Sequence, residues 1–159
     1  MEGLAYAHER AVIHRHIQPK NIILSGDRVK IMNFGLADPP PDTWTDADIV
    51  YMPPEQLAEG ELCAGSDLYA VGVFVYELLT RRVPFEAPSH AALIEQCLSA
   101  FPRPPRELNP DIPPQLEDLI LALLAKDTRD RPQSASKVLP RLTKGWALLQ
   151  NPQVIRQIA

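Results

Sequence analysis

A mainly helical fold with one small β-hairpin is predicted for this 159-residue chain. The longest apolar run, Leu68 to Leu79, is apolar nearly all round, as in a helix that is buried on most of its faces. Leucine and isoleucine recur at helical spacing from Leu116 to Leu124, which predicts a second helix that packs by one face. Two short β-type runs, Ile22–Leu24 and Val29–Met32, flank Ser25-Gly26-Asp27 in the pattern of a hairpin.

The remaining elements follow from local signals along the chain. Met1 to Glu9 is expected to be the end of a helix. Pro39 to Asp48 is polar and rich in proline, which predicts a surface loop, and after it the chain is expected to be helical to its end. Pro113 and Pro114 suit the first turn of the helix that contains Leu116. Ala91–Leu98 and Ser134–Leu142 are weaker helical segments.

Composition excludes several classes of function. With 45% hydrophobic residues the chain can bury a core, and a net charge of -4 without a basic run predicts neither nucleic-acid nor membrane binding. Cys63 and Cys97 lie far apart without further ligands, so they are expected to be reduced core thiols and not a disulfide or a zinc site. The charged first residues are unlike a signal peptide, so a cytoplasmic location is expected.

Five motifs occur in an order that carries a family resemblance. They are His14-Arg15-His16-Ile17-Gln18-Pro19-Lys20-Asn21, Asn33-Phe34-Gly35, Tyr51-Met52-Pro53-Pro54-Glu55, the run from Ser66 to Gly72, and Asp127 to Pro132. In this order they resemble the catalytic loop, the Asp-Phe-Gly motif, the end of the activation segment, the central helix and the late Arg-Pro turn of protein kinases. The likeness is closest to the carboxy-terminal lobe of bacterial serine/threonine kinases.

The resemblance extends from Leu4 to about Leu142. It implies a kinase-like C-lobe over residues 1–142, truncated at its N-terminus, and leaves residues 143–159 as an unassigned extension. No Gly-rich loop, strand Lys or helix Glu precedes Met1, so the N-lobe is predicted to be absent. A split gene or a late start codon would explain such a beginning, and truncation of the first helix should expose apolar surface.

The resemblance also implies that three catalytic positions are substituted. His16 stands where the family has the Asp that accepts the substrate proton, Gln18 where it has the Lys that steadies the phosphate, and Asp48 where it has a Thr. Histidine can act as a general base near neutral pH, so His16 in that role is an alternative. We expect His16 and Asp48 to form a replacement ion pair that keeps the shape of the loop without catalysis.

The two magnesium positions implied by the resemblance are Asn21, which is retained, and Asn33, which replaces an Asp. A hard divalent cation favours charged carboxylates, so metal affinity should fall sharply. No cofactor is therefore expected, and ATP and magnesium follow from family resemblance only. Weak nucleotide binding is an open alternative.

Structural positions of the family are retained. The resemblance implies a buried pair between Glu55 and Arg131, and an Asp67 carboxylate that accepts backbone N–H groups around His14 and Arg15. Judged one at a time, Glu55 would be a solvated acid, Asp67 a simple helix cap and Arg131 a surface cation. The order of the five motifs favours the structural roles.

Arg15 has a second implied role, because in the family it receives a phosphorylated residue of the activation loop. Thr43 or Thr45 could be that residue, although solvated loop threonines are the favoured interpretation.

Three hypotheses for function follow. The first is a catalytically inactive kinase-like module that binds a protein partner, through a groove near Leu93 to Phe101. The second is a serine/threonine kinase that transfers the ATP γ-phosphate to protein hydroxyls, with the N-lobe supplied by another chain or missing from the gene model. The third is a decaying gene segment without a stable role. The family is an ATP-dependent phosphotransferase, but the chain is predicted to be inactive as encoded.

Overall fold

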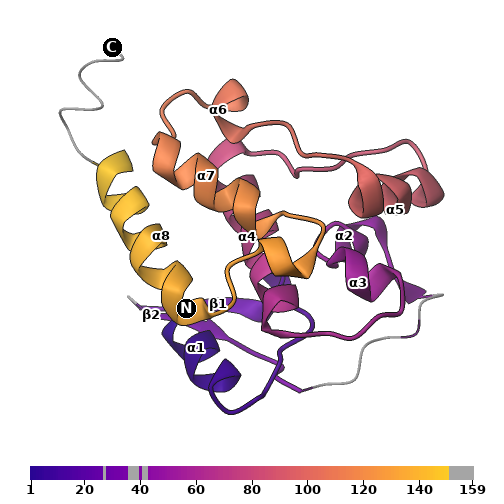
Figure 1. The fold of residues 1–159 in the computed structure, drawn as a ribbon, viewed down its shortest axis with the longest axis horizontal. Helices are drawn as coiled ribbons and strands as arrows, with labels where there is room; N and C mark the ends of the chain where they lie inside the picture. The colour runs from indigo at the N-terminus through magenta and orange to yellow at the C-terminus, as the bar shows by residue number, and fades with distance from the viewer. Residues whose placement is uncertain (27, 36–39, 41–42, 151–159) are drawn as a thin grey trace.

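The structure, a computed structural model, describes residues 1–26, 28–35, 40 and 43–150. Helices surround the long helix α4, and a two-stranded sheet lies beside α1 (Figure 1). The elements are α1 (Glu2–His8), η1 (Pro19–Asn21), β1 (Ile22–Ser25), β2 (Arg28–Ile31), α2 (Asp46–Ile49), α3 (Pro54–Leu57), α4 (Ala64–Thr80), α5 (His90–Ser99), α6 (Pro105–Leu108), α7 (Pro114–Leu123), η3 (Thr128–Asp130) and α8 (Ala135–Leu149). The predicted class, mainly helical with one small hairpin, is confirmed.

The hairpin pairs β1 and β2 in antiparallel register, with Ile22 opposite Ile31 and Leu24 opposite Val29. Gly26 in the turn has a φ of 59°, in the left-handed region that glycine adopts without steric cost. Ile22 and Ile31 pack on the core, whereas the Leu24 and Val29 side chains nearer the turn are exposed. The second strand begins one residue earlier than the sequence predicted.

Helix α4 is buried on most of its faces, as its apolar composition predicted, and it connects two core clusters. Tyr69 and Val73 belong to a cluster with α5 and α7, while Leu68 and Val71 belong to a cluster with α1, α7 and α8. Gly72 lies so close to α7 that an added Cβ would come 2.7 Å from the Cβ of Leu123. A residue without a side chain therefore allows the two helices to approach closely.

Two segments differ from the predictions. The segment predicted as a loop to Asp48 is helical from Asp46, because Thr45 and Asp48 form a capping box that starts α2. Residues 39, 41 and 42 of that segment lie outside the described residues. Helix α8 runs past Leu142 to Leu149, and its Gly145 packs against Leu116. The predicted boundary after residue 142 thus falls inside a helix, and residues 151–159 of the extension are not described.

The two cysteines are free thiols in different settings. Cys97 is fully buried as predicted, and burial raises its pKa to about 11. The prediction of a core thiol is wrong for Cys63, which is exposed because it is the N-cap residue of α4. Within the described part of the chain, no helix is long and apolar enough to cross a membrane.

Candidate functional site

The loop from His14 to Asn21, called the 14–21 loop below, is held in place by Asp67 in the first turn of α4. The two carboxylate oxygens of Asp67 accept hydrogen bonds from the backbone N–H groups of His14 and Arg15, each at 2.8 Å. Arg15 has a φ of 72°, which is unfavourable for a residue with a side chain. The hydrogen bonds to Asp67 offset that strain, and this is the role that the resemblance implied for Asp67.

His8, at the end of α1, is a third partner of Asp67. Its Nε2 lies 2.8 Å from Oδ2 of Asp67, and its side chain is 6% exposed. Sequence reasoning missed His8, since 59 residues separate it from Asp67. This side-chain partner of a buried carboxylate becomes visible only when α1 is placed against α4.

The ring of His14 connects the 14–21 loop to the segment around Asn33. His14 is fully buried, and its Nε2 donates a hydrogen bond of 2.6 Å to the backbone carbonyl of Met32. The rings of His14 and Phe34 pack edge to face, with their centres 4.6 Å apart. These two contacts of His14 fix the position of the Asn33-Phe34-Gly35 motif relative to the 14–21 loop.

The three residues that the resemblance places at catalytic positions, His16, Gln18 and Asp48, lie together. Nε2 of Gln18 is hydrogen-bonded to Nε2 of His16 and donates to Oδ1 of Asp48 at 3.3 Å. Nε2 of His16 lies 3.8 Å from Oδ1 of Asp48, so the two side chains that we expected to pair are close. An amide N–H is a donor, so Nε2 of His16 accepts in this arrangement.

Lys20 is the cation closest to Asp48, with Nζ 2.7 Å from Oδ1. Partial burial would raise the pKa of Asp48, but hydrogen bonds from Lys20, Thr45 and Gln18 outweigh that effect and lower it well below its usual range. Asp48 is therefore ionised at neutral pH. Sequence reasoning missed Lys20 because the family pattern prescribes no residue at that position. The lysine two residues after Gln18 was the feature that could have indicated a cation for Asp48.

The two positions implied for magnesium, Asn21 and Asn33, are hydrogen-bonded to each other. Nδ2 of Asn33 donates to Oδ1 of Asn21 at 2.9 Å, and Nδ2 of Asn21 donates to the backbone carbonyl of His16 at 2.7 Å. Among the described residues, no group of three or more His, Cys, Asp or Glu side chains could hold a metal. Two neutral amides without a carboxylate do not fit a hard divalent cation.

The implied pair of Glu55 and Arg131 is present and well enclosed. Arg131 donates to both carboxylate oxygens of Glu55, at 2.7 and 2.8 Å, and its side chain is 0% exposed. Ser66 Oγ donates a further hydrogen bond of 2.6 Å to Glu55. Burial would raise the pKa of Glu55, but the bonds from Arg131 and Ser66 lower it. Arg131 also donates to backbone carbonyls at the start of α4 and after α7, so it joins three segments.

The two threonines considered as phosphate acceptors use their hydroxyls locally. Oγ1 of Thr45 donates to Oδ2 of Asp48 at 2.6 Å and accepts from the backbone N–H of Asp48, as the cap of α2. Oγ1 of Thr43 donates to the carbonyl of Pro40 at 2.7 Å. Both side chains are exposed, and the Thr45 hydroxyl contributes to the start of a helix.

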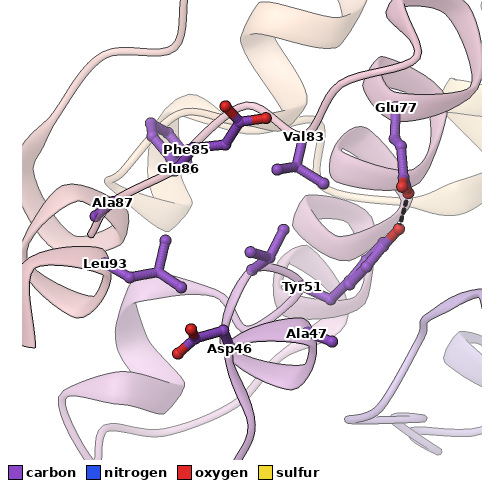
Figure 2. Close-up of a pocket in the computed structure, with 10 residues that line it drawn as sticks. Asp46, Ala47, Tyr51, Glu77, Val83, Phe85, Glu86, Ala87 and Leu93 are labelled. Carbon is purple, nitrogen blue, oxygen red and sulfur yellow. Dashed lines mark hydrogen bonds between the residues drawn. The ribbon is translucent and has the colours of Figure 1, made fainter. Parts of the chain in front are cut away.

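A cavity of about 320 Å³ lies between α2, α4 and the segment that leads into α5 (Figure 2). It is lined by Asp46, Ala47, Val50, Tyr51, Glu77, Val83, Phe85, Glu86, Ala87 and Leu93. Leu93 belongs to the groove that the sequence analysis expected. Phe101, at the other end of that groove, does not line the cavity and is 90% exposed.

The cavity combines apolar walls with three carboxylates, those of Asp46, Glu77 and Glu86. The Tyr51 hydroxyl donates to Glu77 (Figure 2), and burial together with this carboxylate raises the pKa of Tyr51, so the hydroxyl stays protonated. Glu86 pairs with Arg82 at 2.8 Å, and Asp46 lies 2.9 Å from His90, which is charged only when protonated. The cavity therefore has apolar walls and a rim of carboxylates, of which Glu86 is paired with a cation.

The family model of the protein kinase domain matches residues 1–141. The chain belongs to the protein kinase family. The kinase-like motifs of the sequence analysis, including the 14–21 loop, all lie within the matched residues.

Curated relatives of this kinase domain include bacterial serine/threonine kinases. The chain is 36% identical to the probable serine/threonine-protein kinase SCO3848 of Streptomyces coelicolor, over 87% of this chain and 22% of that protein. It is 40% identical to serine/threonine-protein kinase pkn3 of Myxococcus xanthus, over 85% of this chain and 28% of that protein. It is 34% identical to serine/threonine-protein kinase PknB of Mycolicibacterium smegmatis, over 92% of this chain and 25% of that protein. The chain thus spans less than a third of the length of these relatives.

Proposed function

We propose that this chain is a non-catalytic protein-kinase module that binds a protein partner. The observation that carries the proposal is the hydrogen bond from Asn33 to Asn21. It occupies the oxygen that the family would offer to magnesium, and it sets an amide where the family has a carboxylate. A metal ion at this oxygen would have to share it with the Asn33 amide and would gain no charged ligand.

The surroundings of His16 support the same conclusion. Phosphoryl transfer needs a group that accepts the hydrogen of the substrate hydroxyl and positive charge near the transferred phosphate. Nε2 of His16 already accepts from Gln18, and Gln18 carries no charge. The lysine of this cluster, Lys20, is paired with Asp48. Each group that chemistry would use is thereby engaged by a neighbour.

A partner-binding role is supported by the retained framework and by the cavity beside α2. The pair of Glu55 and Arg131 and the contacts of Asp67 keep the fold in the absence of catalytic groups. The cavity volume of about 320 Å³ lies within the range of roughly 300 to 1,000 Å³ that binding pockets occupy. An apolar interior with a rim of carboxylates favours an apolar peptide side chain next to a cationic one.

Nucleotide binding tests the proposal. Melting temperatures would be measured with ATP and magnesium, and with ATP and a chelator, for the chain and for the double variant His16→Asp/Asn33→Asp. We expect a cooperative melt and no shift for the unmodified chain. Gln115→Asp, which adds a carboxylate to an exposed position of α7, controls for the change in charge.

The alternative is a serine/threonine kinase that uses an N-lobe from another chain, with His16 as the base. The retained Asn21 and the serine/threonine kinases among the relatives favour it. A magnesium-dependent shift of the unmodified chain would support this alternative and would overturn the non-catalytic proposal. Loss of a cooperative melt would instead support a decaying segment.

A further inference from the structure

We propose that Lys20 and Asp48 form a latch that positions α2, and with it one wall of the cavity, against the 14–21 loop. The latch would hold α2 without a phosphate and without a nucleotide. The inference rests on the proposed function in one respect only, that the cavity binds a protein partner. The latch itself rests on the contacts of Asp48. Its partner Lys20 was not among the positions that the resemblance implied.

The carboxylate of Asp48 needs a cation, and Lys20 is the group that supplies it. The Asp48 side chain is 12% exposed, so most of its surface is removed from water. An anion that is buried to this extent is costly unless it is paired and hydrogen-bonded. His16 lies farther away, at 3.8 Å, and its ring nitrogen accepts from Gln18. Lys20 at 2.7 Å therefore carries the charge of the pair.

The two oxygens of Asp48 have separate tasks. Oδ2 accepts from the backbone N–H of Thr45 at 3.1 Å and from the Thr45 hydroxyl at 2.6 Å, which starts α2. Oδ1 accepts from Lys20 at 2.7 Å and from Gln18 at 3.3 Å, which joins α2 to the 14–21 loop. One side chain thus starts the helix and also ties it to the loop.

The latch changes which elements the charges connect. The resemblance implies an acid at position 16 and a lysine at position 18, both within the loop. In this chain those positions hold no charge of that kind, and the paired acid and lysine are Asp48 and Lys20. An attraction that would act inside one loop therefore acts between the loop and α2, so the substitutions at the catalytic positions add a connection while they remove chemistry.

Helix α2 needs such a connection. It has four residues, far fewer than an isolated helix requires in water, so its stability comes from tertiary contacts. Ile49 is fully buried in the core on one side, and Asp48 contacts the 14–21 loop on another. Asp46, Ala47 and the following Val50 line the cavity (Figure 2). Releasing Asp48 would therefore loosen the cavity wall.

Amide hydrogen exchange of the full chain, without partner or nucleotide, tests the latch. The reporters are the backbone N–H groups of Ile49 and Val50, which donate to Thr45 and Asp46, with α7 amides as internal reference. In Lys20→Met we expect exchange at both reporters to rise about three- to tenfold, by loss of a partly buried pair. Lys20→Arg should stay within about twofold of the unmodified chain, because it keeps the charge.

Two further variants decide whether the residues act together. Asp48→Asn should raise exchange as Lys20→Met does, and the double variant Lys20→Met/Asp48→Asn should rise no further than Asp48→Asn alone. Arg129→Met, which removes an exposed cation paired with Asp127 at 2.5 Å, is the matched control and should leave both reporters unchanged.

The latch is wrong if Lys20→Met matches the Arg129→Met control while Asp48→Asn raises exchange, because Asp48 would then act as a helix cap alone. It is also wrong if the two single effects add fully in the double variant. Lys20 is 60% exposed, so its replacement should leave the fold intact, and a cooperative melt checks this. None of these outcomes depends on partner or nucleotide binding, so failure of the latch and failure of the proposed function can be told apart.

Discussion

Two polar clusters of the molecule differ in how many of the charged residues implied by the resemblance they contain. In the cluster around the 14–21 loop, the family's charged catalytic positions are occupied by His16, Gln18 and Asn33. In the cluster around Arg131, both charges implied by the resemblance are present and bonded to each other. The first cluster would act on a substrate and the second connects segments of the fold. The difference is what the proposed non-catalytic role predicts, because only the second cluster is needed for the fold.

Solvent access explains why the two clusters tolerate change differently. The Arg131 side chain is 0% exposed, so loss of its partner would leave a charge without water or counterion. The side chains of His16 and Lys20 are 19% and 60% exposed. Water can therefore compensate in part for changes at His16 and Lys20, whereas Gln18 at 5% and Asp48 at 12% exposed are more enclosed. We therefore expect substitutions at His16 and Lys20 to disturb the fold less than substitutions at Arg131.

The largest expected effect comes from breaking the pair of Glu55 and Arg131. Arg131→Ala should lower the free energy of unfolding by about 3 to 5 kcal/mol, because it leaves Glu55 buried without a counterion. Urea denaturation followed by circular dichroism measures the change. The matched control is Arg129→Ala, which removes an arginine 87% exposed and should change stability by less than about 1 kcal/mol. Equal losses in the two variants would show that burial does not separate these arginines.

A second test concerns packing at the centre of the fold, where no charge is involved. Gly72→Ala should lower the free energy of unfolding by about 1 to 3 kcal/mol, because the new Cβ would lie 2.7 Å from the Cβ of Leu123. Gly3→Ala in α1 is the control, since an added Cβ there meets nothing within 4 Å. A stabilising Gly72→Ala would mean that α4 and α7 can separate without loss.

The framework was largely predictable from the sequence, and the reason is local patterning. A long apolar run and a turn signal between β-type residues identified the central helix and the hairpin, because each is specified by neighbours in the sequence. The partners Glu55 and Arg131 came from motif order, and the structure has that contact. Elements that depend on capping were less predictable: Thr45 starts a helix within a segment whose composition is typical of a loop.

The polar contacts around the substituted positions were predictable only in part. The proximity of His16 and Asp48 was expected, but the closer partner of Asp48 is Lys20, at a position where the family pattern prescribes nothing. His8 was missed because its partner Asp67 is distant in sequence. Residues 143–159 were left unassigned although helix was expected there, because Gly145 weakens the local pattern and the packing of α8 on α7 is not visible in the sequence.

The pH dependence of stability provides a third, smaller test within the structural cluster. Nζ of Lys126 donates to the carbonyl of Cys97 at 2.6 Å and lies 4.0 Å from the centre of the Phe85 ring. Burial lowers its pKa to about 8 from an ordinary value of 10.5. Between these pH values the folded chain binds fewer protons at this group than the unfolded chain does. Lys126 therefore makes the free energy of unfolding rise with pH in that window.

Comparison with Lys126→Met isolates this contribution. The raised pKa values of Cys97 and of buried tyrosines act in the opposite direction at higher pH, and they are present in both proteins. The difference in stability between the unmodified chain and Lys126→Met should increase from pH 7.5 to about 9.5, measured by urea denaturation. A difference that stays constant with pH would mean that Lys126 titrates near its ordinary pKa.

The smallest expected effects lie at Asn33, in the cluster around the 14–21 loop. Asn33 has a φ of 65°, in the left-handed region, where alanine is strained and glycine is not. Asn33→Gly loses the hydrogen bond to Asn21 but relieves the backbone, so we expect a change within about 0.5 kcal/mol. Asn33→Ala loses the same bond and keeps the strain, so it should be less stable than Asn33→Gly by about 1 kcal/mol. Equal losses in urea denaturation would mean that the bond to Asn21, and not the backbone, determines stability here. This cluster would then share the structural constraint of the Arg131 cluster.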